Sequence, residues 1–156
     1  MAETKKKLSG IVATAVVTVL AIVSCILYCV NGTAEGYFKG TNEGVVVAMS
    51  VIAIVCLLGS IALTYTKTDS KFVVLLIDAL RIAATALLIA CLLMFISTRV
   101  QGLGYIFFSD ENVLDEVQTP ANMSSAYTAI TGFVFYGLAW IAGIVACFMG
   151  MVKKED

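Results

Sequence analysis

The sequence has no histidine, a single proline and a single tryptophan in 156 residues, and only 13% of its residues are charged. A soluble domain of this length carries about 25% charged residues. Without histidine the chain lacks the commonest ligand of catalytic zinc and the general base of a Ser-His-Asp triad. Sites of those two kinds, and proton relays that use histidine, are therefore largely excluded.

What the chain has in abundance is apolar side chains. They make up 60% of the sequence, and the mean hydropathy is +0.98. A globule of this size cannot bury so much apolar surface, so the composition indicates an integral membrane protein. Crossing a bilayer takes roughly 20 apolar residues, and four segments are long enough: 8–30, 44–65, 72–98 and 125–152.

These segments predict the fold. In lipid each segment must satisfy its own backbone hydrogen bonds, which makes helix the realistic conformation. We therefore expect an all-α integral membrane protein, with four transmembrane helices in an antiparallel bundle that forms a single domain over residues 1–156. The connections would be outer loops at residues 31–43 and 99–124 and an inner loop at residues 66–71.

The distribution of basic residues predicts the orientation. Outside the spans, only Lys39 and Arg99 lie on one side of the predicted membrane, whereas seven lysines lie on the other: Lys5, Lys6, Lys7, Lys67, Lys71, Lys153 and Lys154. Loops rich in lysine and arginine stay in the cytoplasm. We therefore predict a multi-pass protein of the plasma membrane with both termini cytoplasmic.

The first segment also resembles a secretory signal, because Lys5–Lys7 precede an apolar run that contains a lipoprotein-like Ser24-Cys25. A removable signal has an apolar core of about 7–15 residues and then turns polar. Here the apolar run continues to Val30. We therefore expect this segment to remain as a permanent span.

Two charges interrupt the third apolar segment. Asp78 and Arg81 are three residues apart, so on a helix they share a face and are predicted to form an intramembrane ion pair. Isolated charges at the bilayer centre cost roughly 2.5–3.5 kcal/mol each, which favours pairing. Two interpretations stay open: the pair lines an ion or proton path, or it fixes helix packing near the cytoplasmic face.

The second outer loop carries most of the outer negative charge, on Asp110, Glu111, Asp115 and Glu116. Carboxylates are ligands that calcium prefers, but the spacing matches no calcium-binding loop. The four residues are more readily interpreted as a solvated acidic surface that docks a basic partner.

Residues 102–108 of the same loop are apolar, with the sequence GLGYIFF. They either extend the third helix or lie along the membrane surface, with Tyr105, Phe107 and Phe108 as interfacial aromatic anchors. Further on, Thr119-Pro120 is typical of a helix N-cap and first helical position, so the fourth helix is expected to begin before the bilayer does.

Two segments carry a resemblance: STRVQGLGYIFFSD at residues 97–110 and TGFVFYGLAWIAGIVACF at residues 131–148. They resemble small four-span membrane proteins of Gram-positive bacteria that are often encoded beside family-three β-glucosidases. The resemblance implies a bacterial plasma membrane and a context of glycan utilisation, and it transfers no catalytic residue. Claudins, connexins and tetraspanins carry cysteines in their outer loops, whereas all five cysteines here lie in the predicted spans.

These observations favour a non-enzymatic accessory, scaffold or anchor subunit whose outer face contacts a membrane-associated partner. The alternative is a small transporter or channel subunit that works as an oligomer. The expected partners are the lipid bilayer and either another protein or a second copy of the chain. No residue pattern predicts a cofactor, a metal ion or a nucleic acid.

The orientation can be tested by labelling single cysteines in a cysteine-free background. Because the positively charged side should stay in the cytoplasm, Ser109→Cys should react with an impermeant maleimide on intact cells and Ser70→Cys should react only after lysis. The reverse pattern would invert the predicted topology.

Overall fold

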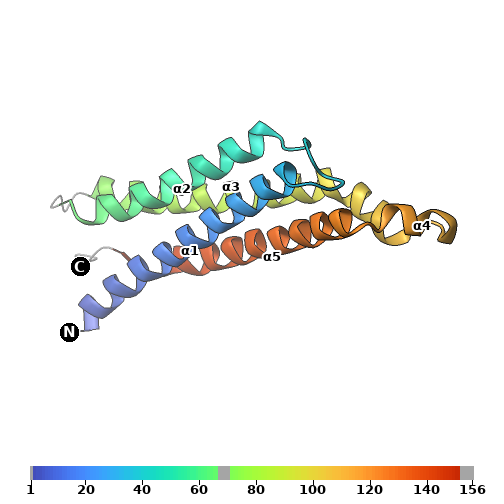
Figure 1. Cartoon of the computed structure of the whole chain (residues 1–156). Helices are drawn as coiled ribbons and strands as arrows, with labels where there is room; N and C mark the ends of the chain where they lie inside the picture. The colour runs from blue at the N-terminus through green and yellow to red at the C-terminus, as the bar shows by residue number, and fades with distance from the viewer. Residues whose placement is uncertain (1, 67–70, 152–156) are drawn as a thin grey trace.

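The computed structural model describes residues 2–66 and 71–151, with side chains from Leu8 onward. These ranges contain five helices and no strand (Figure 1): α1 (Ala2–Thr33), α2 (Gly44–Thr64), α3 (Lys71–Phe108), α4 (Glu111–Val117) and α5 (Pro120–Phe148). All except α4 are long and apolar enough to cross a membrane. The chain is therefore an all-α, multi-pass membrane protein, as its composition predicts.

The four long helices form an antiparallel bundle. Helix α1 packs against α5 and α2, and α3 packs against α2 and α5. The beginning of α1 and the end of α5 lie at one end of the bundle, called the terminal end below (Figure 1). Helix α4 lies at the opposite end, called the α4 end.

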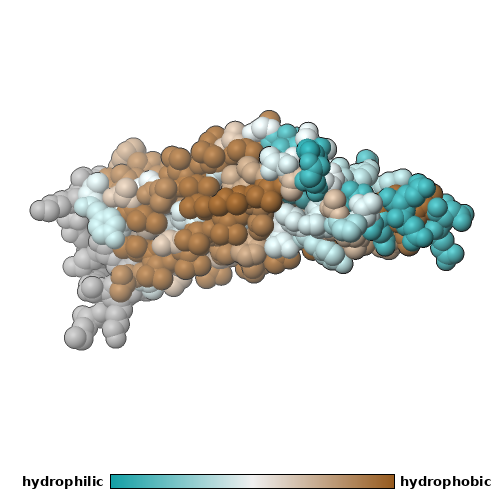
Figure 2. All heavy atoms as spheres, viewed as in Figure 1, coloured by the Kyte–Doolittle hydropathy of each residue, from teal (hydrophilic) through white to brown (hydrophobic). Residues whose placement is uncertain are grey.

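The bundle exposes apolar side chains and buries small and hydroxyl-bearing ones. Fully buried positions include Thr14, Ser50 and Ser60, whereas Val16, Val55 and many other aliphatic residues are exposed. Figure 2 shows apolar residues covering the visible face of the long helices. Lipid solvates such a surface, while most buried serine and threonine hydroxyls donate to a carbonyl of their own helix, as Thr14 does to Gly10 at 2.9 Å. The buried hydroxyl of Ser125 is an exception and makes no hydrogen bond to the described residues.

Small residues let the helices approach closely. A Cβ atom on Gly10 of α1 would overlap the carbonyl oxygen of Gly150, and one on Gly143 would overlap the side chain of Thr85 on α3. In lipid there is little hydrophobic drive between helices, so close van der Waals contact of this kind holds them together. The small residues of α3 and α5 therefore serve packing inside the bundle.

The prediction of a 26-residue outer loop at 99–124 is wrong in structure, because most of this segment is helical. Helix α3 continues to Phe108, α4 occupies Glu111–Val117 and α5 already begins at Pro120. Of the two interpretations of residues 102–108, the extended helix is confirmed. Arg99 ended the apolar run in the sequence, but in the structure it lies inside the bundle and does not end the helix.

The start of α5 confirms the predicted cap. Thr119 is the N-cap, its side chain accepts a hydrogen bond from the backbone N–H of Asn122, and Pro120 takes a first helical position where a missing N–H costs nothing.

Helix α3 is longer than a single crossing of the bilayer requires. The 38 residues of α3 measure about 57 Å at 1.5 Å per residue, whereas the hydrocarbon core is about 30 Å thick. The segment that extends past the ends of α1 and α2 comprises residues 99–124 and is called the knob below. Figure 2 shows hydrophilic residues gathered at this end of the molecule.

A matched pair of glycines tests the close contact at the terminal end. Gly10→Ala places a methyl group against backbone atoms and should lower the free energy of unfolding in mild detergent by about 1–3 kcal/mol. Gly137→Ala meets open space inside α5, so it should leave stability unchanged or raise it by up to about 1 kcal/mol. Thermal or denaturant unfolding measures both, and equal effects would argue against the tight contact.

Candidate functional site

Two buried arginines lie on the inner face of α3. The side chain of Arg81 is 2% exposed and that of Arg99 is 1% exposed. They are 18 residues apart, which is about five helical turns and about 27 Å along the axis, so they share one face. That distance is close to the thickness of the hydrocarbon core, about 30 Å. One guanidinium lies toward each end of the membrane-crossing part of the bundle.

Each of the three guanidinium nitrogens of Arg99 donates a hydrogen bond. Its Nε donates to Asn31 Oδ1 at 2.9 Å, its Nη1 to the backbone carbonyl of Thr41 at 3.1 Å, and its Nη2 to Asn42 Oδ1 at 3.2 Å. Asn31 belongs to α1, and the other two acceptors belong to the connection between α1 and α2. The guanidinium therefore joins α3 to two separate parts of the chain.

Aromatic rings enclose the same guanidinium. Its Cζ atom lies 5.0 Å from the ring centre of Phe38, 5.6 Å from that of Phe95 and 5.7 Å from that of Tyr28. Cations at such distances are attracted by the ring faces. Among the described residues no carboxylate forms an ion pair with Arg99. Neutral oxygens and ring faces therefore replace a counter-ion.

The acceptors are themselves held by further hydrogen bonds. Asn31 Nδ2 donates to the carbonyl of Ser125 on α5 at 2.8 Å, and Asn42 Nδ2 donates to the carbonyl of Cys29 at 3.1 Å. The backbone N–H of Glu43 donates to the Tyr28 hydroxyl at 2.7 Å. We call Arg99, Asn31, Asn42 and the three rings the Arg99 cluster. It fastens α1, α3, α5 and the 34–43 connection together at the base of the knob.

Arg81 makes a different set of contacts. Its Nη1 donates to the carbonyl of Met149 at 3.0 Å, whereas Asp78 Oδ1 lies 3.8 Å from the same nitrogen. Asp78 is 55% exposed. Met149 is the C-cap of α5, where unpaired carbonyls and the negative end of the helix dipole favour a cation. Asp78 and Arg81 are thus within ion-pair distance, but the hydrogen bond of Arg81 goes to the end of α5.

A third polar group lies between the two arginines. Ser50 Oγ is 2.7 Å from the hydroxyl of Tyr136 and donates to Cys91 Sγ at 3.4 Å, and all three side chains are fully buried. On the inner face of α3, Leu88 separates this group from Arg81 and Phe95 separates it from Arg99. These contacts are typical of interhelical hydrogen bonds that hold a bundle together.

The structure places the four acidic residues at the outer tip of the knob. Asp110 is the N-cap of α4 but makes no capping hydrogen bond, and Glu111, Asp115 and Glu116 are exposed on α4. Within the described ranges no three acidic or cysteine side chains are grouped so that they could hold a metal ion. The four carboxylates therefore form an open, negatively charged surface.

The aromatic residues of the knob differ in their surroundings. Tyr105 is 47% exposed and Phe108 is 87% exposed. Phe107 is half-buried, with its ring centre 6.3 Å from that of Tyr127. Tyr105 and Phe108 lie six and nine residues beyond Arg99, which is about 9 and 14 Å along the helix. Their role as anchors in the bilayer interface stays a prediction.

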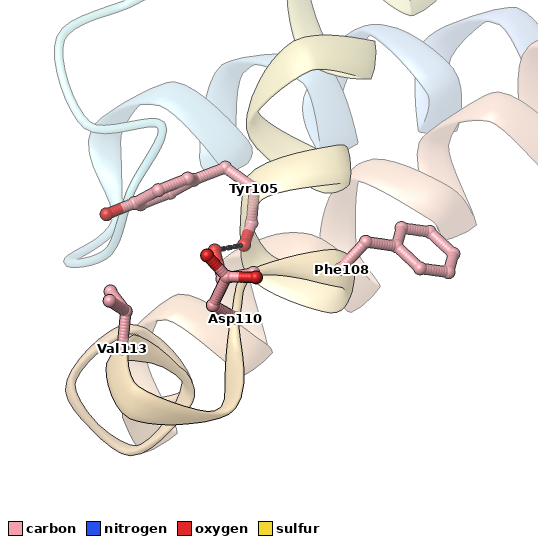
Figure 3. Close-up of a pocket in the computed structure, with 5 residues that line it drawn as sticks. Tyr105, Phe108, Asp110 and Val113 are labelled. Carbon is pink, nitrogen blue, oxygen red and sulfur yellow. Dashed lines mark hydrogen bonds between the residues drawn. The ribbon is translucent and has the colours of Figure 1, made fainter.

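A hollow of about 340 Å³ opens where α3 meets α4. It is lined by Tyr105, Phe108, Ser109, Asp110 and Val113. Figure 3 shows Tyr105 and Val113 on either side of a gap with Asp110 beside them, and the Phe108 ring pointing away. The hollow thus combines one aromatic wall, one aliphatic wall and one carboxylate.

No family model, curated protein or solved structure matches this chain. The chemistry of the site follows from the contacts above, which are those of structural bracing inside the bundle and of an exposed acidic surface outside it.

Sequence reasoning missed the Arg99 cluster. It placed Arg99, Asn31 and Asn42 in outer loops, because polar residues at the ends of an apolar run normally mark its boundary. One signal was available, since Arg81 and Arg99 are separated by five whole helical turns. A helix that continued past residue 98 would have put both on one face.

Substitutions of Arg99 test whether the Arg99 cluster holds the 34–43 connection in place. Arg99→Met keeps much of the volume but leaves the buried Asn31 Oδ1 and two partly buried oxygens without donors, which should lower the free energy of unfolding by about 2–4 kcal/mol. Arg99→Lys keeps the charge but loses the planar fork, so it should also destabilise. Both should speed hydrogen exchange at the amides of Lys39, Gly40 and Thr41, which donate to the carbonyls of Gly36, Gly32 and Phe38 respectively.

Lys39→Met provides the control for the Arg99 variants. Lys39 is exposed and pairs only with the exposed Glu35, so its loss should change stability by no more than about 0.5 kcal/mol. If Arg99→Met leaves hydrogen-exchange rates in the 34–43 connection at the wild-type value, the Arg99 cluster does not hold this connection in place.

Proposed function

We propose that this chain is a non-enzymatic accessory, scaffold or anchor subunit, which holds a partner protein at the membrane through its knob. In this proposal both termini are cytoplasmic, the membrane is the plasma membrane, and the knob lies on the outer side. The observation that carries the proposal is the length of α3, which extends about 27 Å beyond the thickness of the hydrocarbon core. Helices extended this far provide a surface outside the lipid.

The charge of the knob favours a basic partner. Asp110, Glu111, Asp115 and Glu116 are all exposed. On the same end of the molecule Lys39 is paired with Glu35, and the cation of Arg99 is buried. An uncompensated negative surface attracts positively charged partners and speeds their association.

The knob is also well ordered by its contacts. The Arg99 cluster holds its base, Gln118 Nε2 donates to the carbonyl of Ile106 at 3.1 Å, and Asn122 Nδ2 donates to that of Val117 at 2.8 Å. A surface that is already ordered loses little conformational entropy when a partner binds. This arrangement suits a docking surface.

The hydroxyls in the middle of the bundle are engaged in hydrogen bonds with one another or with the backbone, which favours a binding role. The hydroxyls of Ser50 and Tyr136 are engaged with each other, and Thr85 donates to the carbonyl of Arg81. The resemblance of residues 97–110 and 131–148 to four-span proteins encoded beside β-glucosidases favours a partner that works in glycan utilisation.

Photo-crosslinking in the native membrane tests the docking role. A photoreactive amino acid at position 115 should yield one reproducible cross-linked partner. Replacing Asp110 and Glu111 with Asn and Gln, and Glu116 with Gln, should reduce that product about tenfold, and high salt should reproduce the loss by screening. The bundle should stay folded, because exposed charges contribute little to stability.

Two controls accompany the experiment. The photoreactive amino acid at Thr66, at the terminal end, should not capture the same partner. Glu35→Gln with Glu43→Gln removes two negative charges from the first connection and should leave the product largely intact. Undiminished capture by the neutralised knob would overturn this docking surface, and ion flux through the protein in liposomes would support the transporter alternative in its place.

A further inference from the structure

We propose that the hollow between α3 and α4 is a receptor for one arginine side chain of the partner that docks on the knob. This inference rests on the proposed docking function and names the chemical group that the knob recognises. The hollow lies at the outer tip of the knob, with Tyr105 from α3, Val113 from α4, and Ser109 and Asp110 from the turn between them (Figure 3).

Asp110 supplies the first part of the argument. It occupies the N-cap of α4, where an aspartate usually accepts a hydrogen bond from a backbone N–H of the first turn. Here the side chain makes no such bond. Its carboxylate therefore keeps its acceptor positions free at the edge of the hollow, where Figure 3 shows it beside Tyr105 and Val113.

Tyr105 supplies the second part. Its ring is about half exposed and rests against Tyr37, with ring centres 5.8 Å apart. An aromatic face attracts a cation, and a guanidinium both stacks on the ring and bonds to a carboxylate. Val113 adds an aliphatic wall that suits the methylene stem of a long basic side chain.

The side chains around the hollow favour a cationic ligand. The Ser109 hydroxyl already uses its proton to donate to the carbonyl of Tyr105 at 2.5 Å. The lining residues contain no basic side chain. Around the hollow, Glu111, Asp115 and Glu116 add further negative charge. These side chains offer acceptors and negative charge, which suit a positively charged ligand that donates hydrogen bonds.

The hollow is formed before any partner arrives. Val117, the last residue of α4, is buried. Gln118 Nε2 joins the end of α4 to α3 by donating to the carbonyl of Ile106. A volume of about 340 Å³ lies at the small end of the range for ligand pockets, which suits a single side chain better than a folded element. Tyrosine and arginine are also the residues that most often dominate binding at protein interfaces.

A peptide titration tests this receptor in the full chain. The protein carries 3-fluorotyrosine at position 105 and is held in nanodiscs of zwitterionic lipid. The probe is the peptide acetyl-Gly-Arg-Gly-amide, compared with analogues that carry citrulline or lysine instead of arginine. The arginine peptide should produce a saturable fluorine shift at position 105 and none when the label is at Tyr65, at the terminal end.

Two variants with the same loss of charge separate the receptor from a diffuse attraction. Asp110→Asn should weaken the apparent affinity about tenfold, because a charge-assisted bond is lost, whereas Asp115→Asn should weaken it less than about twofold. Asn is as good an N-cap as Asp, so α4 should remain folded in the first variant. Equal effects of both variants would overturn the receptor.

The analogues provide the other decisive outcomes. Citrulline has nearly the shape of arginine without its charge, so an equal shift with the citrulline peptide would show that no cation is recognised and would overturn the proposal. An equal response to lysine would overturn the assignment to a guanidinium. Retained cross-linking at position 115 without a peptide response would overturn the receptor alone. A specific peptide response without any cross-linked partner would overturn the docking role alone.

Discussion

The burial of Arg99 is the constraint on which the α4 end of the molecule depends. An arginine inside a bundle loses the hydration of its charge, so its environment has to supply compensation. Here the compensation comes from three oxygen acceptors and three aromatic rings. Five of these six groups lie far from Arg99 in the sequence, and only Phe95 is a neighbour, one turn away on α3. The connection between α1 and α2 can satisfy the guanidinium only by folding back onto α3.

The first connection is ordered as a consequence. Phe38 is 2% exposed, although it lies in a turn-rich segment that would suit the headgroup region on its own. Gly36 and Gly40 have φ values of 139° and 76°, which lie in the region that favours glycine and allow the chain to reverse around the ring. Gly102 on α3 leaves room for Tyr37 and Phe38, since a Cβ atom there would overlap both rings. The Arg99 cluster thus accounts for the burial of Phe38 and for the glycines at positions 36, 40 and 102.

The membrane explains the rest of the bundle. Lipid weakens the usual drive for apolar side chains to gather inside, so the interior includes many alanine, glycine, serine and threonine residues, and many leucine, valine and isoleucine side chains face outward. Beyond the lipid the same helices continue as the knob. Helical backbone satisfies its own hydrogen bonds, and the knob therefore needs only a few tertiary contacts to remain ordered. That combination leaves its acidic and aromatic side chains available for recognition.

Sequence patterns alone predict the number of long helices, the approximate bounds of α1 and α2, and the Thr119-Pro120 start of α5. These features depend on local properties, namely the length of apolar runs and the chemistry of a helix cap. The apolar segments 8–30 and 44–65 agree with α1 and α2 within a few residues, apart from the early start of α1 at Ala2. The proximity of Asp78 and Arg81 likewise follows from their spacing alone.

The positions of the two arginines inside the bundle depend on contacts between distant segments. A hydropathy pattern predicts that the span ends at Arg99, because the pattern contains only local information. The acceptors of Arg99 belong to Asn31, Thr41 and Asn42, which lie 57–68 residues away in the chain. The same holds for Arg81, whose hydrogen-bond partner at Met149 is 68 residues distant, while the nearby Asp78 faces outward. A guanidinium is stable in a bundle only when distant segments converge on it, and that convergence is a property of the folded chain.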